Sequence, residues 1–445
     1  MVFDLVLEGG TVASSEGVTQ ADVGIVGDRI AELGSLGARK ARRKIDVRGL
    51  MLLPGPIDSQ VHFREPGMEH KEDIESGTRA ALAGGVTTIF EMPNTSPPTV
   101  TAEALQDKLD RAAETASCNY GFFVGASPEN ASDLARLERL PGTPGVKMFV
   151  GSSTGSLLVA DDASVKRAML SGHKRITVHS EDHFRLVQRK REIPEDADVH
   201  WHPVWRDPQA AVESTRRLLA LCAETARPLH ILHISTAEEC EILWDAKRRG
   251  LNVTCEVTPQ HLTFAAPEAY DRWGTLVQMN PPIRSAEHRD RIRCALKEGL
   301  FCTIGSDHAP HTLEEKVKPF PSSPSGMPGV QTLLPVMLDF VNQGVLELTQ
   351  LVQLLCENPA SIFGVIDRGK IAPGMIADIT AVDLNAKRPV EASWLQYKCG
   401  WSPFEGQELT GWPVHVVLGG EVALEDGEIA LEKRGKQISF TEWNR

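Results

Sequence analysis

Imidazole and carboxylate side chains recur at the ends of short apolar stretches in the middle of the chain. Histidines stand on four of these stretches, namely His62, His179, His230 with His233, and His261, and Asp307 stands on another. One histidine in such a place is usually structural, but several on separate stretches are hard to explain by packing alone. Imidazole and carboxylate groups without a thiolate are typical ligands of Zn²⁺ or a similar divalent ion. The pattern therefore predicts a metal site.

Lys147 is a cation in apolar surroundings. Val146, Met148 and Phe149 flank it, so its ammonium would be costly to bury without a partner. One interpretation is a lysine whose head reaches water. The other is carbamylation by CO2, which would turn the cation into a carboxylate-like bridge between two metal ions. The second interpretation accounts for the lysine and for the neighbouring metal ligands together.

Eight apolar stretches in the middle of the chain are predicted to be strands, with amphipathic stretches between them that are predicted to be helices. The predicted strands are residues 51–63, 86–93, 119–126, 146–150, 176–180, 229–235, 253–259 and 301–310, and the amphipathic stretches include residues 71–83, 102–116, 209–226 and 237–249. Strand–helix alternation predicts a parallel sheet, and eight units over roughly 250 to 300 residues predict an α/β fold of the (β/α)8 TIM barrel type. In such a barrel the carboxyl ends of all strands meet on one face, which would bring the candidate ligands together.

The alternative α/β architecture is an open, doubly wound sheet. That fold would favour a GxGxxG turn after an early strand, and the sequence has none there. We therefore expect the barrel. Residues 189–207 are polar and rich in proline and tryptophan, and we expect them to form a loop over the barrel mouth.

Both ends of the chain differ from the middle. Residues 1–50 and 373–445 alternate short β-rich stretches with glycine turns such as Gly9-Gly10 and Gly419-Gly420. This alternation predicts one small β-sandwich domain assembled from both termini, with the barrel in residues 51–372.

Composition limits the partners of the protein. A formal net charge of −13 argues against nucleic acid and anionic membranes, and no apolar run approaches the ~20 residues of a membrane span. The first residues lack the layout of a signal peptide. The eight cysteines contain no CxxC pair, which argues against a disulfide framework and a thiolate zinc site. We expect a cytoplasmic protein that acts on a small molecule.

The candidate ligands resemble those of the amidohydrolase superfamily. Asp58 and His62, four residues apart on the first predicted strand, are part of this resemblance. Four motifs are similar to those of the dihydroorotase family within it: His62-Phe63-Arg64-Glu65-Pro66-Gly67, Met92-Pro93-Asn94-Thr95, Asn280-Pro281-Pro282-Ile283-Arg284 and Asp307-His308-Ala309-Pro310-His311. The resemblance covers nearly the whole chain and implies one or two Zn²⁺ ions, a carbamylated Lys147 and a homo-oligomer. The implied metal ligands are His62, Lys147, His179, His233 and Asp307, with Asp307 also the catalytic acid–base.

A substrate with a free carboxylate accounts for further polar residues. Arg64 can hold a carboxylate through two hydrogen bonds, and Asn94 and His311 can donate to it as well. By resemblance, the substrate ring is held by Asn280, Ser325 and Gly326. The predicted reaction is reversible, metal-dependent hydrolysis of L-dihydroorotate to N-carbamoyl-L-aspartate in pyrimidine synthesis. A ring without a carboxylate would leave Arg64 unpaired, which is costly.

Two positions depart from the family pattern. Gln60 stands where the first histidine of a His-x-His motif is expected, and Gln260 replaces a histidine of a Pro-His-His motif. The change at position 60 removes a metal ligand, so the number of ions is open. Two other functions also stay open. One is the same chemistry on another ring, as in hydantoinases, allantoinases or imidases. The other is a non-catalytic barrel that binds aspartate transcarbamoylase.

Overall fold

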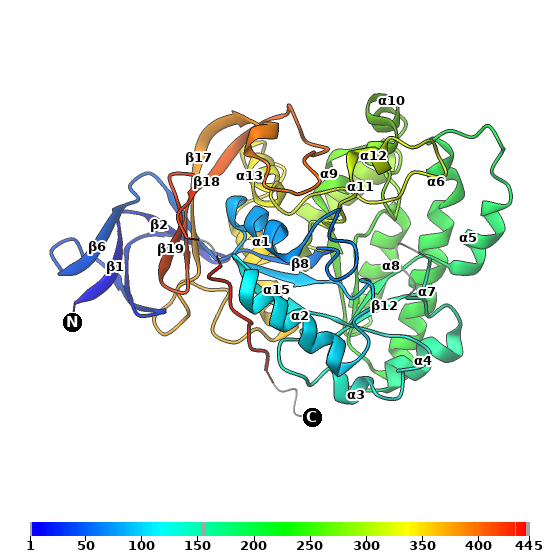
Figure 1. The fold of residues 1–445 in the computed structure, drawn as a ribbon, viewed down its shortest axis with the longest axis horizontal. Helices are drawn as coiled ribbons and strands as arrows, with labels where there is room; N and C mark the ends of the chain where they lie inside the picture. The colour runs from blue at the N-terminus through cyan, green and yellow to red at the C-terminus, as the bar shows by residue number, and fades with distance from the viewer. Residues whose placement is uncertain (1, 153–156, 432, 442–445) are drawn as a thin grey trace.

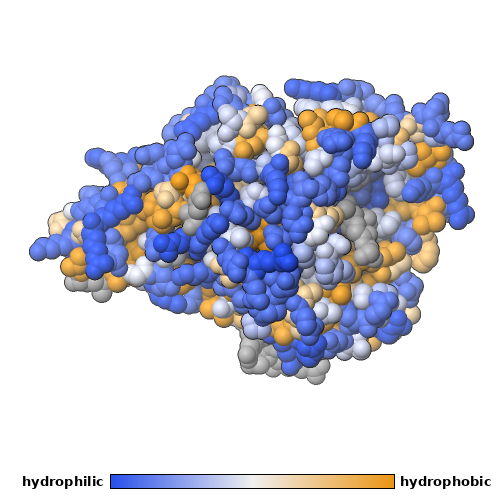
Figure 2. All heavy atoms as spheres, viewed as in Figure 1, coloured by the Kyte–Doolittle hydropathy of each residue, from blue (hydrophilic) through white to orange (hydrophobic). Residues whose placement is uncertain are grey.

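The barrel and the terminal strands form two parts of the molecule. A computed structural model describes residues 2–152, 157–431 and 433–441. Figure 1 shows strands from both ends of the chain on the left and the helix-covered barrel on the right. Figure 2 shows that hydrophilic side chains cover most of this face, with smaller apolar areas between them.

Eight strands form a closed parallel barrel. They are β8 (Ile57–Val61), β9 (Thr88–Glu91), β10 (Asn119–Phe122) with its continuation β11 (Val124–Gly125), β12 (Val146–Phe149), β13 (Ile176–His179), β14 (Leu229–Ile231), β15 (Val253–Val257) and β16 (Thr303–Ile304). Successive strands pair in parallel. A parallel bridge between Val61 and His308 closes the ring, and the backbone N–H of His62 donates there to the carbonyl of His308 at 2.7 Å. The predicted (β/α)8 barrel is confirmed.

Helices surround the barrel and many begin at a capping side chain. The α-helices are α1 (Ile74–Ala83), α2 (Ala102–Thr115), α3 (Leu134–Leu137), α4 (Asp162–Leu170), α5 (His183–Lys190), α6 (Trp201–Trp205), α7 (Pro208–Thr225), α8 (Ala237–Arg248), α9 (Pro259–Thr263), α10 (Glu268–Trp273), α11 (Ala286–Lys297), α12 (Leu313–Lys316), α13 (Leu333–Asn342), α14 (Leu348–Val352) and α15 (Asn358–Phe363). Shorter turns are η1 (Gly274–Val277), the π-helical η2 (Gln353–Glu357) and η3 (Ala392–Trp394). Asp73, Asp207 and Thr236 cap α1, α7 and α8 by accepting a backbone N–H from the first turn. The four predicted amphipathic stretches are all helical.

Strands from the two ends of the chain form two further sheets. Their orders are β5-β4-β1-β6 and β20-β19-β18-β17-β7-β2-β3. The strands are β1 (Phe3–Glu8), β2 (Thr11–Ser14), β3 (Gly17–Gln20), β4 (Asp22–Val26), β5 (Arg29–Gly34), β6 (Ala41–Asp46), β7 (Met51–Pro54), β17 (Ile379–Pro389), β18 (Glu408–Leu418), β19 (Glu421–Glu425) and β20 (Glu428–Ile429). Apolar side chains of both sheets, including Leu5, Ile25 and Val417, share one buried cluster. The two sheets therefore pack as the predicted β-sandwich.

The predicted first barrel strand, residues 51–63, is in fact two strands. Its first part, β7, pairs with β2 and β17 in the terminal sheet, and only β8 enters the barrel. Pro56 lies between them and has no N–H with which to continue a ladder. The division of the chain into domains at residues 51 and 373 stays a prediction. That division assigns β7 to the barrel domain, whereas β7 pairs with strands of the terminal sheet.

The predicted loop at residues 189–207 contains the short helix α6, which its polar composition did not indicate. The indole N–H of Trp205 donates to the carbonyl of Leu186 at 2.8 Å, and His202 is fully buried. These contacts hold the segment against the barrel. Across the described part of the chain, no helix combines the length and apolar character needed to cross a membrane.

Candidate active site

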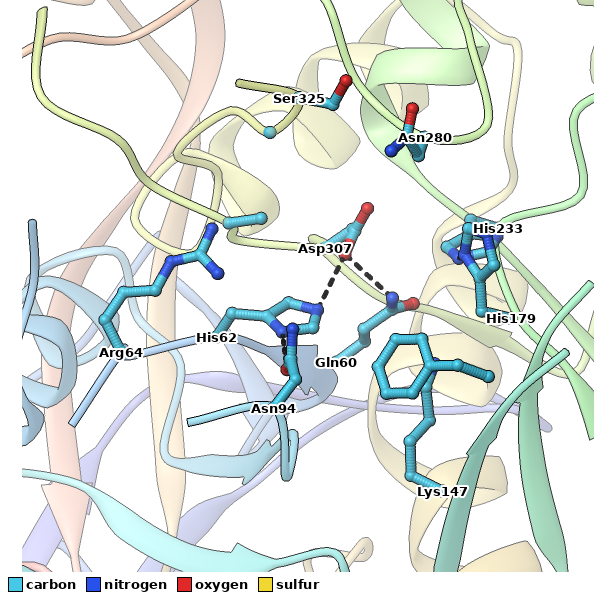
Figure 3. A pocket seen from close by; sticks show the side chains of 13 residues that line it. Gln60, His62, Arg64, Asn94, Lys147, His179, His233, Asn280, Asp307 and Ser325 are labelled. Carbon is cyan, nitrogen blue, oxygen red and sulfur yellow. Dashed lines mark hydrogen bonds and ion pairs between the residues drawn. The ribbon is translucent and has the colours of Figure 1, made fainter. Parts of the chain in front are cut away.

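A pocket of about 350 Å³ lies at the carboxyl ends of the barrel strands (Figure 3). Its lining consists of Gln60, His62, Arg64, Asn94, Lys147, Phe149, His179, His233, Asn280, Asp307, Ala309, Ser325 and Gly326. Of the predicted site residues, only His311 is outside this lining, and its Nε2 lies 3.3 Å from Nη2 of Arg64. The barrel thus brings the predicted residues together, while the role of each one stays a prediction.

Two histidines from neighbouring strands face each other in the pocket. Nδ1 of His179 lies 3.0 Å from Nε2 of His233. On its other side, His179 donates from Nε2 to the carboxylate of Glu181 at 3.0 Å, so Nδ1 carries the free lone pair. Burial lowers the pKa of both imidazoles, that of His233 well below its usual range. Both rings are therefore neutral, which is the form that binds a metal ion.

Lys147 lies on β12 below these histidines and is completely buried. Its Nζ has no hydrogen-bond partner among the residues that the structure describes and stands 4.6 Å from the centre of the Phe149 ring. Burial lowers the pKa of Lys147 to about 7, although the charges of Asp307 and Glu256 oppose this effect. A large share of the lysine is thus a neutral amine near neutral pH, and a neutral amine is the form that can react with CO2.

Asp307 lies in the pocket between Gln60 and His62 and contacts both side chains. Its Oδ1 accepts a hydrogen bond from Nε2 of Gln60 at 2.8 Å and lies 3.3 Å from Nε2 of His62. The Nδ1 of His62 is 2.7 Å from Oδ1 of Asn94. Burial raises the pKa of Asp307 to about 7, with Lys147 acting in the opposite direction. A carboxyl group with this pKa can both accept and release a proton near neutrality.

Arg64 forms the other wall of the pocket and is 1% exposed. Its Nε donates to the carbonyl of Pro310 at 3.0 Å, and its backbone has a positive φ of 67°. Burial lowers the pKa of Arg64 to about 10, so the guanidinium remains charged at neutral pH. Among the described residues it forms no ion pair with a carboxylate. A buried cation of this kind calls for an anionic partner.

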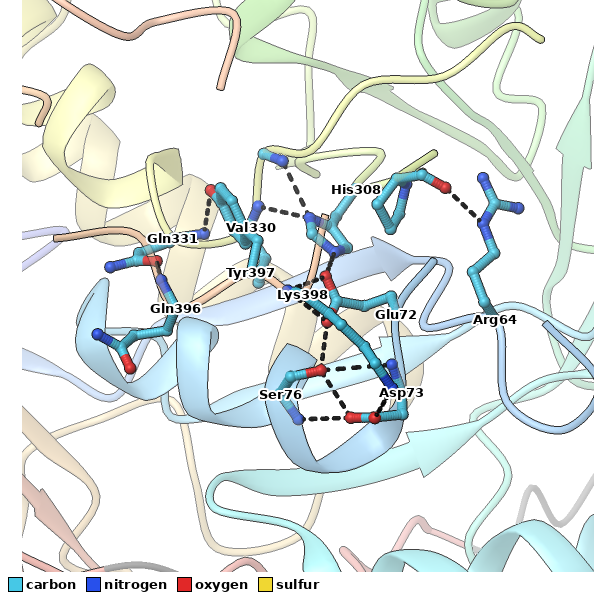
Figure 4. A network of polar contacts seen from close by, with 12 residues as sticks. Arg64, Glu72, Asp73, Ser76, His308, Val330, Gln331, Gln396, Tyr397 and Lys398 are labelled. Carbon is cyan, nitrogen blue, oxygen red and sulfur yellow. Dashed lines mark hydrogen bonds and ion pairs between the residues drawn. The ribbon is translucent and has the colours of Figure 1, made fainter. Parts of the chain in front are cut away.

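His308, next to Asp307, points away from the pocket into a polar network (Figure 4). Its Nδ1 accepts the backbone N–H groups of Gly329 and Val330 at 3.0 and 3.4 Å, and its Nε2 lies 3.5 Å from Glu72. The same Glu72 accepts the backbone N–H of Lys398 at 3.1 Å. The network therefore ties the end of the last barrel strand to α1 and to the segment before β18.

The segment at residues 189–207 contacts the predicted ring-binding residues. His202 of α6 donates from Nε2 to Oδ1 of Asn280 at 3.1 Å, and the same nitrogen lies 3.4 Å from Oγ of Ser325. Burial lowers the pKa of His202 well below its usual range, so the ring is neutral. The helix of this segment thus borders the pocket.

Sequence reasoning missed several residues that support the site. Glu181 and Arg206 form a buried ion pair behind His179, and Lys71 contacts His311 at 3.1 Å. The position of Glu181, two residues after His179 at a strand end, was a usable signal. Arg206 lies in the predicted loop at residues 189–207, which carries no periodic signal, and Lys71 begins the amphipathic stretch at residues 71–83, whose pattern does not indicate a contact with His311. By contrast, His261 at the changed strand-7 motif faces Thr258 and Pro281 and does not line the pocket.

Known proteins share both the fold and the length of this chain. Residues 51–423 match the amidohydrolase family. The dihydroorotase of Methanothermobacter thermautotrophicus is 35% identical over 445 residues, covering 98% of this chain and 97% of the relative. The L-hydantoinase of Paenarthrobacter aurescens is 30% identical over 444 residues, 97% of each protein. The solved structure of L-hydantoinase (dihydropyrimidinase) from Arthrobacter aurescens has a TM-score of 0.94 at 29% identity, and the match covers 98% of this chain and 100% of that one.

The chain therefore belongs to the amidohydrolase family. It is an enzyme that hydrolyses cyclic amides, and its relatives within that family include dihydroorotases and hydantoinases.

Proposed function

We propose that the enzyme catalyses the reversible hydrolysis of L-dihydroorotate to N-carbamoyl-L-aspartate, a step of pyrimidine synthesis. The observation that carries this proposal is the buried guanidinium of Arg64 in the pocket wall, which forms no ion pair with a carboxylate among the described residues. Dihydroorotate is a cyclic amide with a free carboxylate, which Arg64 can bind through two charge-assisted hydrogen bonds. Asn94, in the same pocket, and His311, beside it, supply further polar groups for that carboxylate.

The donor set fits a divalent metal ion. Nδ1 of His179 and Nε2 of His233 face each other, and Nζ of Lys147, which has no hydrogen-bond partner among the described residues, is buried in the same pocket. In the proposal, Zn²⁺ is held by these three residues, with Lys147 carbamylated, and His62 and Asp307 complete the set. When bound, the ion supplies Lewis acidity, which lowers the pKa of water and polarises a carbonyl.

Asp307 is the proposed proton carrier. It takes the proton of the attacking water and delivers it to the ring nitrogen as the amide C–N bond breaks. The carbonyl carbon gains the hydroxyl group and becomes a carboxylic acid, which releases its proton to solvent as a carboxylate, and the nitrogen leaves as part of the ureido group. Asn280, Ser325 and Gly326 are proposed to orient the ring, and Arg64 fixes its carboxylate, so that the reacting carbonyl is held near Asp307.

The direct test is an assay of zinc-loaded enzyme with dihydroorotate and, in the reverse direction, with N-carbamoyl-L-aspartate. We expect hydrolysis to dominate at mildly alkaline pH and ring closure at mildly acidic pH. Absence of turnover in both directions, in protein with measured zinc, would reject the proposed substrate.

A second candidate is hydrolysis of a ring without a carboxylate. It is favoured by the hydantoinase relatives, one of which matches this chain over nearly its whole length. Comparing kcat/KM for dihydroorotate, allantoin and hydantoins separates the two, and a dominant rate on a hydantoin would favour the second. Assembly into a homo-oligomer and association with aspartate transcarbamoylase stay predictions, which light scattering and co-purification would test.

A further inference from the structure

Gln60 occupies the centre of the predicted metal site. Its Nε2 donates to Oδ1 of Asp307 at 2.8 Å, and Nε2 of His62 lies 3.3 Å from the same carboxylate oxygen. The side of the Gln60 amide that faces Asp307 is therefore its N–H donor. A cation bound between His62 and Asp307 would have to displace this hydrogen bond or lie beside a positively polarised N–H group.

The oxygen of the Gln60 amide is directed elsewhere. The amide donates its N–H to Asp307, so Oε1, the other end of the same amide, is turned away from that carboxyl group. Within the described part of the chain, Oε1 is buried without a hydrogen-bond partner, as is Nζ of Lys147. In Figure 3 the oxygen lies on the side of the pocket where His179 and His233 stand. Unpaired buried polar atoms are costly, so Oε1 and Nζ are atoms that a bound ligand could satisfy.

The two halves of the site differ in the number of groups that they offer. Lys147, His179 and His233 provide three groups on one side. On the other side only His62 and Asp307 are available besides an oxygen shared with carbamylated Lys147, and within the described residues no cluster of three or more His, Cys, Asp or Glu side chains is arranged to hold a metal ion. Firmly held zinc ions usually have at least three protein ligands. Once Lys147 is carbamylated, its half meets this requirement with groups of its own. The half at His62 and Asp307 reaches three ligands only by sharing the carbamate of Lys147.

We propose that this enzyme retains one metal ion per chain, in the half formed by Lys147, His179 and His233, and that Gln60 prevents firm binding of a second ion. This inference rests on the proposed metal-dependent function and sets the number of ions it uses. The Gln60 amide then lies between the proposed proton carrier and the proposed metal ion. Its N–H holds the proposed proton carrier Asp307, and its oxygen faces the side where the ion binds.

The test is the metal content of the wild-type protein and of variants at position 60. Each is produced with Zn²⁺ and bicarbonate and then passed through metal-free buffer before elemental analysis. The wild type and the control Gln60→Leu, which has no ligand atom, are expected to hold one zinc per chain. Gln60→His and Gln60→Glu add an imidazole or a carboxylate beside Asp307, and their zinc content is expected to double.

A second readout does not depend on activity. Protein stripped with a chelator is titrated with Co²⁺, whose visible absorption reports protein-bound ions, and circular dichroism checks that each variant is folded. The expected end point is one equivalent for the wild type and two for Gln60→His or Gln60→Glu. A wild type that keeps two ions or none, or folded His and Glu variants that both stay at one, would overturn the inference. A protein with one zinc and no dihydroorotate turnover would instead reject the proposed substrate.

Discussion

Nζ of Lys71 lies 3.1 Å from Nδ1 of His311, and the geometry of this pair sets the proton on the histidine. An ammonium group can only donate, so Nδ1 is the acceptor and Nε2 carries the N–H. Burial, together with the charges of Arg64 and Lys71, lowers the pKa of His311 well below its usual range, so the ring is neutral. Nε2–H reaches the carbonyl of Ser325 at 3.1 Å and stands beside the Arg64 guanidinium. The N–H of His311 is therefore fixed on the side of the ring that faces Arg64.

Replacing Lys71 by Met is expected to remove the contact that keeps the proton of His311 on Nε2, so that the ring can also carry it on Nδ1. KM for dihydroorotate should rise by about 3-fold to 10-fold, from losing roughly one neutral hydrogen bond. Lys71→Arg keeps a donor and should retain most of the affinity. The ¹⁵N shifts of the His311 ring report the tautomer directly. An unchanged tautomer in Lys71→Met, or an equal loss on substrates without a carboxylate, would contradict the assignment.

Replacing Arg64 by Ala tests the proposed carboxylate contact. Loss of a buried, charge-assisted pair should cost roughly 2 to 4 kcal/mol, or about 30-fold to 1000-fold in kcat/KM for dihydroorotate. Lys at this position should restore only part of the rate, because it is a point charge and not a planar fork. Metal content should be unchanged, whereas His233→Ala should lose metal and activity together. If kcat/KM for Arg64→Ala stays within about threefold of the wild type, less than 1 kcal/mol, the carboxylate is held elsewhere.

Glu181 is expected to control metal affinity through His179. Burial works against its charge, but Arg206 holds the pKa of Glu181 well below its usual range, so it accepts the Nε2–H of His179. Glu181→Gln can donate to that nitrogen instead, which would place the proton on Nδ1. Zinc affinity, measured by competition with a chelator, should fall about 10-fold to 100-fold. The exposed Glu224→Gln on α7 is the matched control, and equal affinities in the two variants would refute this role.

His200 is expected to make the segment at residues 189–207 sensitive to pH. Burial opposes protonation, but hydrogen bonds to Asp271 and Asp198, at 2.9 and 3.1 Å, raise the pKa of His200 above its ordinary value. Because the folded state favours the protonated ring, its contribution is complete below the unfolded pKa of about 6.5 and is lost as pH rises through the higher folded value. The bridge to α10 should therefore weaken on the alkaline side.

Hydrogen-exchange protection factors measure this effect, because they correct for the intrinsic dependence of exchange on pH. Between pH 6 and pH 8.5 the factors at residues 198–206 should fall in the wild type. In His200→Gln they should be low at both values. A pH response of the same size in the variant would show that another group is responsible.

The sequence by itself determined the barrel and the types of residue at its mouth. Strand–helix alternation and polar strand ends are local patterns, and parallel strands must bring their carboxyl ends to one face. The predicted strand at residues 51–63 was wrong as a single strand, because apolar composition does not show that its two halves pair with different sheets.

Only the tertiary structure decided which atoms of the site residues form hydrogen bonds with one another. The Gln60 amide takes its direction from Asp307, 247 residues away in the chain, and Lys71 sets the proton of His311 across 240 residues. A side-chain amide or an imidazole can present either a donor or an acceptor, and its partner selects which one. Residue type therefore predicted which groups meet in the pocket, whereas the atoms that face one another follow from contacts between distant strands.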